Sequence, residues 1–503
     1  MKVLPVSWLC LAAVAGGPVT AVARPVPAKE DRSIQAQLDA WFTKAARAAP
    51  GTWGIAVATL DGQLIWGVQP GRSMIPASTV KLFTTGFARS VVGGDARRQT
   101  RVLGSGHVDP QTGTWIGSWA LELNGDPTLE RASRGGPSLS ELAFQLYQSG
   151  IRRLMGPFSV VSALGEASAS YPDVWSPRHR GRLFAPLIGS LTLNENLLSF
   201  AIAPGAASGR APAVVSESPV GVGELVDIRA RTVLGRYSRL RFERAPGGRY
   251  IVTGTIGTRA RTKWFTSTAP DPRALLEATW SRALRDAGIE WIRAASGLSA
   301  PVSLVTQAVL AQVSSEPFDS IASEVNRRSL NIGAELMLRW AAGDDHPADR
   351  LTAHVQQITG EQSGIRLVDG SGLSHDDRVT PLAFISYLAR FPLSPAGRGF
   401  SQLLPTNGVG TLRKLARGLP GPGIVRAKTG TLGDVATLTG YLGRSDGVLL
   451  ISLMYNGSRV WSARQQQWKL FRLLGAEGVI IPDDSVSAGA QLGGENREGR
   501  PNP

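Results

Sequence analysis

The sequence predicts a mixed α/β domain that is interrupted by a mostly β inserted region of one or two smaller domains. Hydrophobic patterns typical of both helices and strands occur over residues 24–96 and again over residues 305–481. Between them, residues 97–304 hold many short apolar runs separated by Gly- and Pro-containing turns, and few helical patterns. The chain has 503 residues. That length allows about two to four domains, each with its own core.

The two ends of the chain differ from the rest in composition. Lys2, an apolar run over residues 6–15 and the small residues 21–23 (Ala-Val-Ala) predict an export signal over residues 1–23. Cleavage after Ala28 would also fit. The run is too short for a membrane span, so we expect no transmembrane span in the mature chain, and export to the periplasm or cell exterior. Residues 482–503 lack an apolar period and predict a disordered tail.

The overall composition excludes some classes of protein and site. A content of 43% hydrophobic and 18% charged residues argues against general disorder. The net charge of +15 favours anionic partners such as cell-wall polymer, lipid or nucleic acid, although a basic enzyme with an Arg-rich surface is the simpler interpretation. The only cysteine, Cys10, lies in the predicted signal, and the five histidines lack ligand spacing. We therefore expect no disulfide, metal or cofactor.

The segment before residue 97 contains a helix and a hairpin. Apolar residues recur at helical spacing over residues 34–49. Two short apolar runs, residues 53–60 and 63–68, then flank Asp61-Gly62. This dipeptide is a strong signal for a two-residue hairpin turn, so the two runs should pair as antiparallel strands.

Ser78 and Lys81 follow this hairpin, at the start of a helix that Pro76 opens. A serine in the first helical turn lies near the positive end of the helix and near free backbone N–H groups. Lys81 is three residues further on and shares a helix face with Ser78. Val80 and Leu82 would desolvate Lys81, lower its pKa and let it act as a base. Taken alone, the pair could equally be a helix cap and a surface lysine.

A second motif, Ser329-Leu330-Asn331, precedes a helical pattern. We expect Ser329 and Asn331 on the loop before that helix, where both side chains can point into a cleft. Helix capping is the alternative interpretation.

The third motif, Lys428-Thr429-Gly430-Thr431, lies in a strand pattern. The lysine and the hydroxyls could hold a carboxylate, and a glycine beside a cleft allows close approach of a substrate backbone. The backbone N–H groups of Thr431 and Ser78 could together form an oxyanion hole. An edge strand blunted by a lysine is the alternative for this motif alone. The three motifs in this order favour one shared function.

In their order and spacing, these motifs resemble those of the class C low-molecular-mass penicillin-binding proteins, the D-alanyl-D-alanine carboxypeptidase/endopeptidase family. Ser329 follows Ser78 by 251 residues (329 − 78), which leaves room for inserted domains that a compact β-lactamase lacks. The similarity extends over about residues 34–481. Further similar stretches are Gly125-Asp126-Pro127, residues 193–196, residues 369–374 and residues 410–412.

The resemblance implies a penicillin-binding/serine β-lactamase-like fold, an antiparallel sheet with helices on both faces and the active site at its edge. It also implies an exported serine peptidase that cleaves the D-Ala-D-Ala bond of peptidoglycan stem peptides, D-alanyl cross-links, or both, and that β-lactams inhibit covalently. It assigns Ser78 as nucleophile, Lys81 as base and Ser329 as proton relay. It assigns substrate binding to Asn331, Lys428, Thr429, Gly430 and Thr431. The oligomeric state stays open.

Two departures from the family pattern are present. Residues 172–178 are basic where the family often has an acidic cluster, and Asp377 stands where it often has Asn. The remaining alternatives are a β-lactamase or esterase of the same fold and a non-catalytic wall-binding protein. His375-Asp376-Asp377 near Ser371 is no sign of a catalytic triad, because triad members meet in space rather than in sequence. Since an exported protein rarely meets nucleic acid, we expect no nucleic-acid partner.

Overall fold

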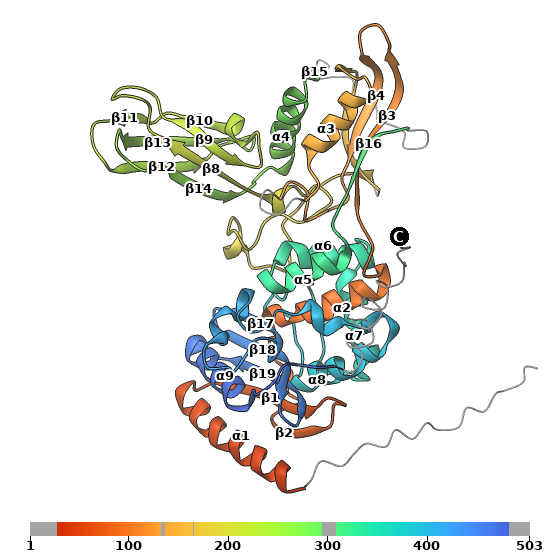
Figure 1. The fold of residues 1–503 in the computed structure, drawn as a ribbon, viewed down its shortest axis with the longest axis vertical. Coiled ribbons are helices and arrows are strands. Elements are labelled where there is room, and N and C mark those ends of the chain that lie inside the picture. The colour runs from red at the N-terminus through yellow and green to blue at the C-terminus, as the bar shows by residue number, and fades with distance from the viewer. Residues whose placement is uncertain (1–27, 132–135, 164, 294–307, 482–503) are drawn as a thin grey trace, which may run out of the picture.

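The computed structural model describes residues 28–131, 136–163, 165–293 and 308–481. The predicted export signal and the predicted C-terminal tail lie outside the described residues. Figure 1 shows a lower unit that contains both ends of the described chain, and an upper region that the chain enters after α2 (Lys81–Val92) and leaves before α5 (Phe318–Arg328). Among the described residues, no helix is both long and apolar enough to cross a membrane.

The lower unit is built on a five-stranded antiparallel sheet with the order β17-β18-β19-β1-β2. The predicted hairpin is confirmed: β1 and β2 pair, and Gly62 in their turn has a φ of 89°. β1 also pairs with β19, so the two ends of the chain complete one sheet. The strands are β1 (Thr52–Thr59), β2 (Leu64–Val68), β17 (Val425–Leu432), β18 (Val435–Arg444) and β19 (Gly447–Asn456).

Helices cover both faces of this sheet, which confirms the predicted fold. Side chains of β1 alternate between the two faces. Ile55 and Val57 pack with α1 and α9, whereas Ala56 and Ala58 join the core under the other helices. The first face is covered by α1 (Ala28–Ala48) and α9 (Val460–Leu474). The second lies under α2 (Lys81–Val92), α5 (Phe318–Arg328), α6 (Asn331–Ala342), α7 (Pro347–Thr359) and α8 (Pro381–Arg390).

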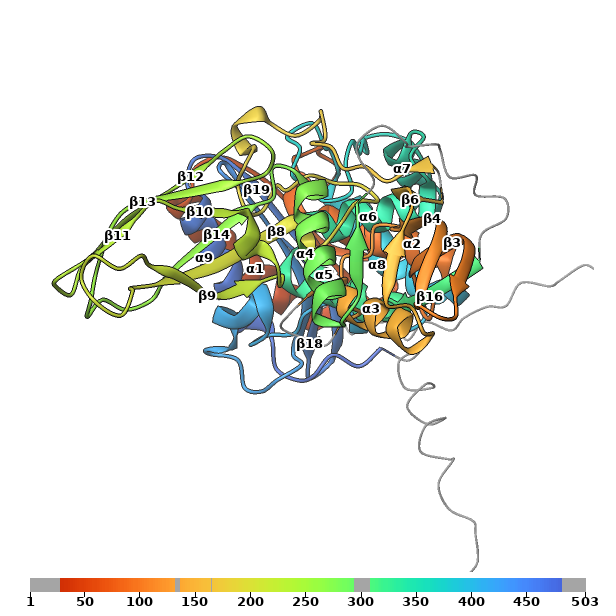
Figure 2. The ribbon, with the colours of Figure 1, turned by 90° about the horizontal axis from the view of Figure 1, so that it is seen from above.

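The inserted region is mostly β, as predicted, and has two lobes. One lobe is a seven-stranded sheet built around the long hairpin of β3 and β4, with α3 and α4 packed on it. The other lobe contains two smaller sheets and projects to one side, as Figure 2 shows from above. The first lobe comprises β3 (Gln99–Asp109), β4 (Thr114–Glu122), β5 (Arg153–Met155), β6 (Phe158–Ser162), β7 (Gly165–Glu166), β15 (Glu290–Ile292), β16 (Ala308–Ser314), α3 (Leu139–Gln148) and α4 (Pro272–Asp286). The second comprises β8 (Leu197–Ala203), β9 (Ala213–Ser218), β10 (Val226–Ile228), β11 (Arg231–Val233), β12 (Ser238–Arg244), β13 (Tyr250–Gly257) and β14 (Lys263–Thr268).

The predicted return at residue 305 lies outside the described residues, and the next described element is β16. β16 pairs antiparallel with β3 and so completes the sheet of the first lobe. We therefore place the return after β16, at α5. The first strand of this lobe, β3, begins at Gln99.

Candidate active site

Ser78 lies in a short 3-10 turn, η1 (Ala77–Val80), that leads directly into α2. The carbonyl oxygen of Pro76 accepts hydrogen bonds from Thr79 Oγ1 at 2.6 Å and from Thr437 Oγ1 of β18 at 2.7 Å. Ala77 has a φ of 49°, a backbone conformation that a non-glycine residue adopts only when its surroundings impose it. The turn that presents Ser78 is therefore fixed to the sheet.

Lys81 is fully buried and its ammonium group points at Ser78. The Nζ atom lies 3.0 Å from Ser78 Oγ, 2.7 Å from Asn331 Oδ1 and 2.6 Å from the carbonyl oxygen of Ser371. Burial lowers the pKa of Lys81 to about 8, although the nearby carboxylates of Asp369, Glu335 and Asp377 act in the opposite direction. The predicted desolvation of Lys81 is thus present in the structure. A lysine with this pKa can release its proton near neutral pH.

A second serine–lysine pair faces the first. Ser329 ends α5 in the left-handed conformation, with a φ of 59°. Its Oγ accepts a hydrogen bond of 2.9 Å from Lys428 Nζ, which also donates to the carbonyl oxygen of Thr429 at 2.7 Å. Burial lowers the pKa of Lys428 well below its usual value, and the charges of Lys81 and Arg464 lower it further. The structure therefore brings both predicted serine–lysine pairs into one site.

Asn331 begins α6 and joins three parts of the fold. Its Oδ1 accepts from Lys81, and its Nδ2 donates to the carbonyl oxygen of Phe184 at 2.8 Å. Phe184 belongs to the insertion, which packs against α6 and Leu373 through a small apolar cluster. Both ends of the Asn331 amide thus have partners, so a bound peptide would have to exchange with Phe184 to reach Nδ2.

Gly430 brings β17 close to Ser78. A Cβ atom at this position would lie 2.7 Å from the carbonyl oxygen of Pro76 and 2.9 Å from the backbone nitrogen of Ser78. Any side chain here would push the edge strand away from the serine. Thr429 is buried and Thr431 is exposed, both beside this contact.

Arg464 of α9 is a residue of the site that sequence reasoning missed. Its fully buried guanidinium donates to the carbonyl oxygens of Gly430 at 2.6 Å and Thr437 at 2.7 Å, and to Thr431 Oγ1 at 3.0 Å. Burial lowers the pKa of Arg464 to about 10, so the group stays positive at neutral pH. It fixes the strand that carries the third motif from the side opposite Ser78.

The segment after Asp369 supplies a hydrogen-bond acceptor for Lys81, the carbonyl oxygen of Ser371. Sequence reasoning gave this segment no role. The Asp369 carboxylate accepts backbone N–H bonds from Ser371 and Ser374 and a bond from Trp175 Nε1. These bonds curl the segment so that the carbonyl oxygen of Ser371 meets Lys81. Asp377 is fully buried beside Asp369, and burial raises its pKa well above the usual value.

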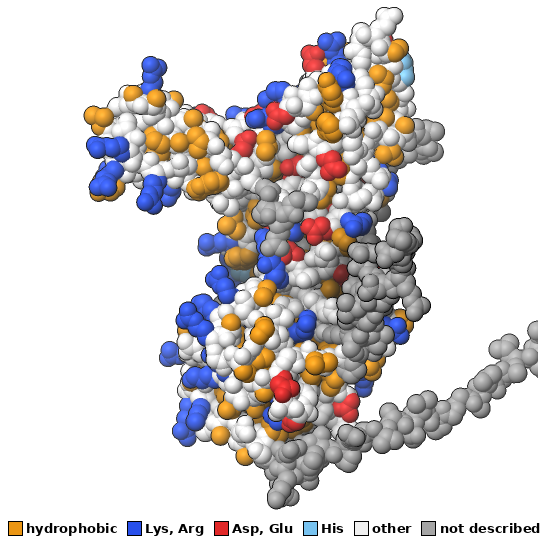
Figure 3. All heavy atoms as spheres, in the orientation of Figure 1, with side chains coloured by type: hydrophobic (Ala, Val, Ile, Leu, Met, Phe, Trp, Pro, Cys, Tyr) orange, Lys and Arg blue, Asp and Glu red, His pale blue; other side chains and the backbone are white. Residues whose placement is uncertain are grey.

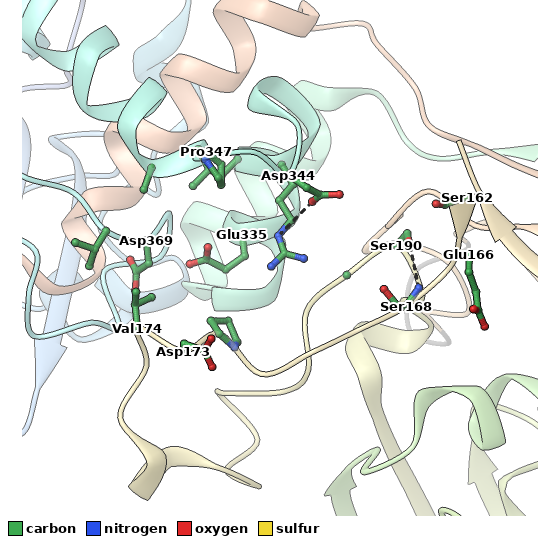
Figure 4. A pocket seen from close by; sticks show the side chains of 16 residues that line it. Ser162, Glu166, Ser168, Asp173, Val174, Ser190, Glu335, Asp344, Pro347 and Asp369 are labelled. Carbon is green, nitrogen blue, oxygen red and sulfur yellow. Dashed lines mark hydrogen bonds and ion pairs between the residues drawn. The ribbon is translucent and has the colours of Figure 1, made fainter. Parts of the chain in front are cut away.

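A pocket of about 510 Å³ is lined by Asp369 and Glu335 and by residues of the insertion. Figure 4 shows Glu335 and Asp369 near each other at one end of it, with Ser168 and Ser190 of the insertion at the other. Burial and the charge of Asp369 raise the pKa of Glu335 to about 7. Neither Ser78 nor Lys81 is among the residues that line this pocket.

The histidine run offers no triad. His375 Nε2 lies 3.1 Å from Asp434 Oδ1, whereas Ser371 is buried and its hydroxyl donates to Asp369. This agrees with the interpretation of the run as a polar loop.

Comparisons with known proteins agree with this site. The profile of the D-Ala-D-Ala carboxypeptidase 3 (S13) family matches residues 34–473. The D-alanyl-D-alanine carboxypeptidase of Actinomadura sp. (strain R39) is 26% identical over 424 residues, which cover 80% of this chain and 77% of the relative. Carboxypeptidase Rv3627c of Mycobacterium tuberculosis is 26% identical over 417 residues, with 79% and 74% covered.

Solved structures show the same fold. Penicillin-binding protein 4 from Haemophilus influenzae superimposes with a TM-score of 0.66 at 19% identity, over 85% of this chain and 99% of that protein. Its complex with a β-lactam gives a TM-score of 0.63 at 20% identity, with the same coverage. The chain therefore belongs to the D-Ala-D-Ala carboxypeptidase 3 (S13) family, and it is a class C low-molecular-mass penicillin-binding protein and a serine hydrolase.

Proposed function

We propose that this protein hydrolyses the D-Ala-D-Ala bond of peptidoglycan stem peptides through an acyl-enzyme on Ser78. The observation that carries the proposal is the 3.0 Å hydrogen bond between Ser78 Oγ and the Nζ of Lys81. Lys81 is fully buried and has a pKa of about 8, so about a tenth of it is neutral at pH 7. A neutral amine at this distance can take the serine proton as the bond to the substrate carbonyl forms.

The second pair serves the leaving group. As the C–N bond to the terminal D-Ala breaks, its nitrogen needs a proton. Ser329 can donate its own proton and recover one from Lys428, which lies 2.9 Å away. The backbone N–H groups of Ser78 and Thr431 would hold the oxyanion, since Gly430 keeps β17 next to Ser78. Once Lys81 has released the proton of Ser78 to solvent, water would attack the acyl-serine with Lys81 again as base, and Ser78 would regain a proton as the ester bond breaks.

The third motif fits the free carboxylate of the terminal residue. Lys428 supplies a positive charge when protonated, and the hydroxyls of Thr429 and Thr431 can donate hydrogen bonds to a carboxylate oxygen. Arg464 adds a second positive charge behind the strand at all pH values of interest. Asn331 orients Lys81 and, after exchange with Phe184, would bind the acyl-side amide.

The comparisons support this substrate class. A relative is a D-alanyl-D-alanine carboxypeptidase, and a protein of the same fold has been crystallised with a β-lactam. We propose export through the N-terminal signal to the periplasm or cell exterior, which is where peptidoglycan lies. Asn331 contacts both Lys81 and Phe184 of the insertion, so the site lies where the lower unit meets the insertion. We include D-alanyl cross-links among its candidate substrates.

Intact-protein mass after brief exposure to a penicillin tests the proposal. Wild type should gain the mass of one drug molecule and Ser78→Ala should gain none. Ser73→Ala is the matched control, because this exposed serine on the same approach to η1 should leave labelling unchanged. Release of D-Ala from a D-Ala-D-Ala peptide, measured in parallel, should follow the same pattern. An intact drug with no adduct would favour a non-catalytic binding protein, and a consumed drug with no adduct would favour a β-lactamase.

A further inference from the structure

A second pocket, of about 890 Å³, lies between α9 and the 3-10 segment η9 (Gly410–Ala416), away from Ser78. Its lining includes Arg413, Lys414, Arg417, Lys469 and Arg472, and no acidic residue. Figure 3 shows Lys and Arg side chains along the edge of the lower unit on the side of α9. The volume is that of a ligand site rather than of a packing defect.

These cations have no carboxylate partners among the described residues. By contrast, some arginines of the insertion form ion pairs with carboxylates, as in Arg153–Glu290 and Arg273–Glu166. The five cations of the pocket repel one another at neutral pH, and an anionic ligand would relieve that repulsion. Arg472 is held in place because its guanidinium donates to the carbonyl oxygens of Arg417 and Lys414.

Two tryptophans complete the pocket and its rim. Trp461 is 54% exposed, and the Nζ of Lys414 lies 5.0 Å from its ring centroid. Trp468 lines the pocket and is only 9% exposed, and its Nε1 donor is buried without a hydrogen-bond partner. A buried donor without a partner costs free energy. An exposed aromatic face beside cations suits a polymer of sugars and carboxylates.

The chain connects this pocket to the catalytic centre. Gly410 at the start of η9 packs against the carbonyl oxygen of Arg327, two residues before Ser329. Just before η9, Asn407 Oδ1 accepts from the backbone nitrogen of Val425, where the edge strand β17 begins. On α9, Arg464 donates a hydrogen bond to the carbonyl oxygen of Gly430 in β17, while Lys469 lines the pocket.

We propose that this basic pocket anchors a second part of the peptidoglycan polymer whose stem peptide is cleaved at Ser78, by binding the carboxylates of a neighbouring stem peptide. This inference rests on the proposed function and extends it. The cations line a recess, which a flexible polymer can enter. A lipid bilayer is flat and would contact only cations that protrude from the protein surface. Anchoring would raise the affinity for the intact wall and leave the chemistry on a short peptide unchanged.

The test compares isolated wall sacculi with a short soluble D-Ala-D-Ala peptide. In one variant, Arg413, Arg417 and Lys469 are all changed to Gln, which removes charge and leaves the backbone contacts of Arg472 intact. The matched control changes Arg236, Arg239 and Arg241 to Gln, which removes the same charge from exposed positions of the insertion. Binding to sacculi is measured by pelleting at two salt concentrations. D-Ala release and penicillin acylation are measured on the short substrates.

We expect the pocket variant to bind sacculi about tenfold more weakly, which corresponds to about 1.4 kcal/mol. Its kcat/KM on the short peptide and its acylation should stay within about twofold of wild type, and the control should bind sacculi as wild type does. Added salt should weaken the binding of wild type to sacculi, and it should weaken the binding of the pocket variant less.

Equal binding by wild type and the pocket variant would overturn the proposal, and so would an equal loss in the control. Binding of wild type to vesicles of anionic phospholipid through the pocket, with no difference on sacculi, would also overturn it in favour of a membrane site. Failure of the proposed function would look different, because wild type would then neither release D-Ala from the short peptide nor be acylated by penicillin.

Discussion

Acylation of Ser78 should depend on pH through Lys81. With a pKa of about 8, Lys81 is mostly protonated at pH 6 and mostly neutral at pH 9. If the neutral amine is the base, the second-order rate of penicillin acylation should rise by about tenfold per pH unit below pH 7 and level off above pH 8. The burial of Lys81 sets this inflection, since an exposed lysine would place it near its usual pKa.

The assay is stopped-flow or quenched mass spectrometry of acylation between pH 5.5 and 9.5, at constant ionic strength. Lys81→Ala should lose about two to four orders of magnitude in rate, and its residual rate should lack the inflection. Lys44→Ala, which alters an exposed lysine of α1, is the control and should keep the wild-type profile.

The fold of Lys81→Ala must be checked by thermal unfolding. The change leaves Asn331 Oδ1 and the carbonyl oxygen of Ser371 without their shared donor, at a cost of about 1–3 kcal/mol for each unpaired group. A flat wild-type profile from pH 6 to 9 would refute the role of Lys81 as base. A folded Lys81→Ala protein that acylates at the wild-type rate would refute it as well.

Three further substitutions test the surroundings of the site. Asp377→Asn should stabilise the protein at pH 7. The pKa of Asp377 is raised in the folded state, so its contribution to stability is intact below the unfolded-state pKa and is lost as pH rises through the folded-state pKa. The stability gain of Asp377→Asn in urea unfolding should therefore vanish near pH 3, and an equal gain at pH 3 and pH 7 would contradict this. Gly430→Ala should slow penicillin acylation at least about tenfold, because its Cβ would lie 2.9 Å from the backbone nitrogen of Ser78; normal acylation would contradict the close approach of β17. Arg464→Met should lower the free energy of unfolding by about 2–5 kcal/mol, since the carbonyl oxygens of Gly430 and Thr437 lose their donor; an unchanged melting temperature would contradict this.

Local spacing explains why the serine–lysine pairs could be predicted. Ser78 and Lys81 are three residues apart on a helical turn, and that spacing alone places their side chains together. Ser329 and Lys428 are 99 residues apart. Nothing local predicts their contact, and only the resemblance to a family with the same motif order suggested it. The hairpin at Asp61-Gly62 was likewise a local signal, and it is confirmed.

Long-range contacts explain what the sequence could not predict. Arg464 lies in a stretch of Ser, Arg and Gln residues that looks like the polar face of an amphipathic helix, yet its guanidinium is buried under β17. Its partners are backbone carbonyl groups, which leave no trace in the sequence. β16 has the alternating pattern of a strand, but the pattern does not say which strand it pairs with, so its place beside β3 was missed.

The two buried lysines connect the two halves of the proposed reaction. Each donates a hydrogen bond to one serine. Burial lowers the pKa of Lys428, and the charge of Lys81 lowers it further. When Lys81 takes the proton of Ser78 it becomes a cation, so Lys428 binds its own proton less tightly at that moment. Lys428 can then pass a proton through Ser329 to the leaving nitrogen as the C–N bond breaks. Because both lysines are desolvated, this repulsion is weakly screened, and transfer of the Ser78 proton to Lys81 favours proton delivery through Ser329.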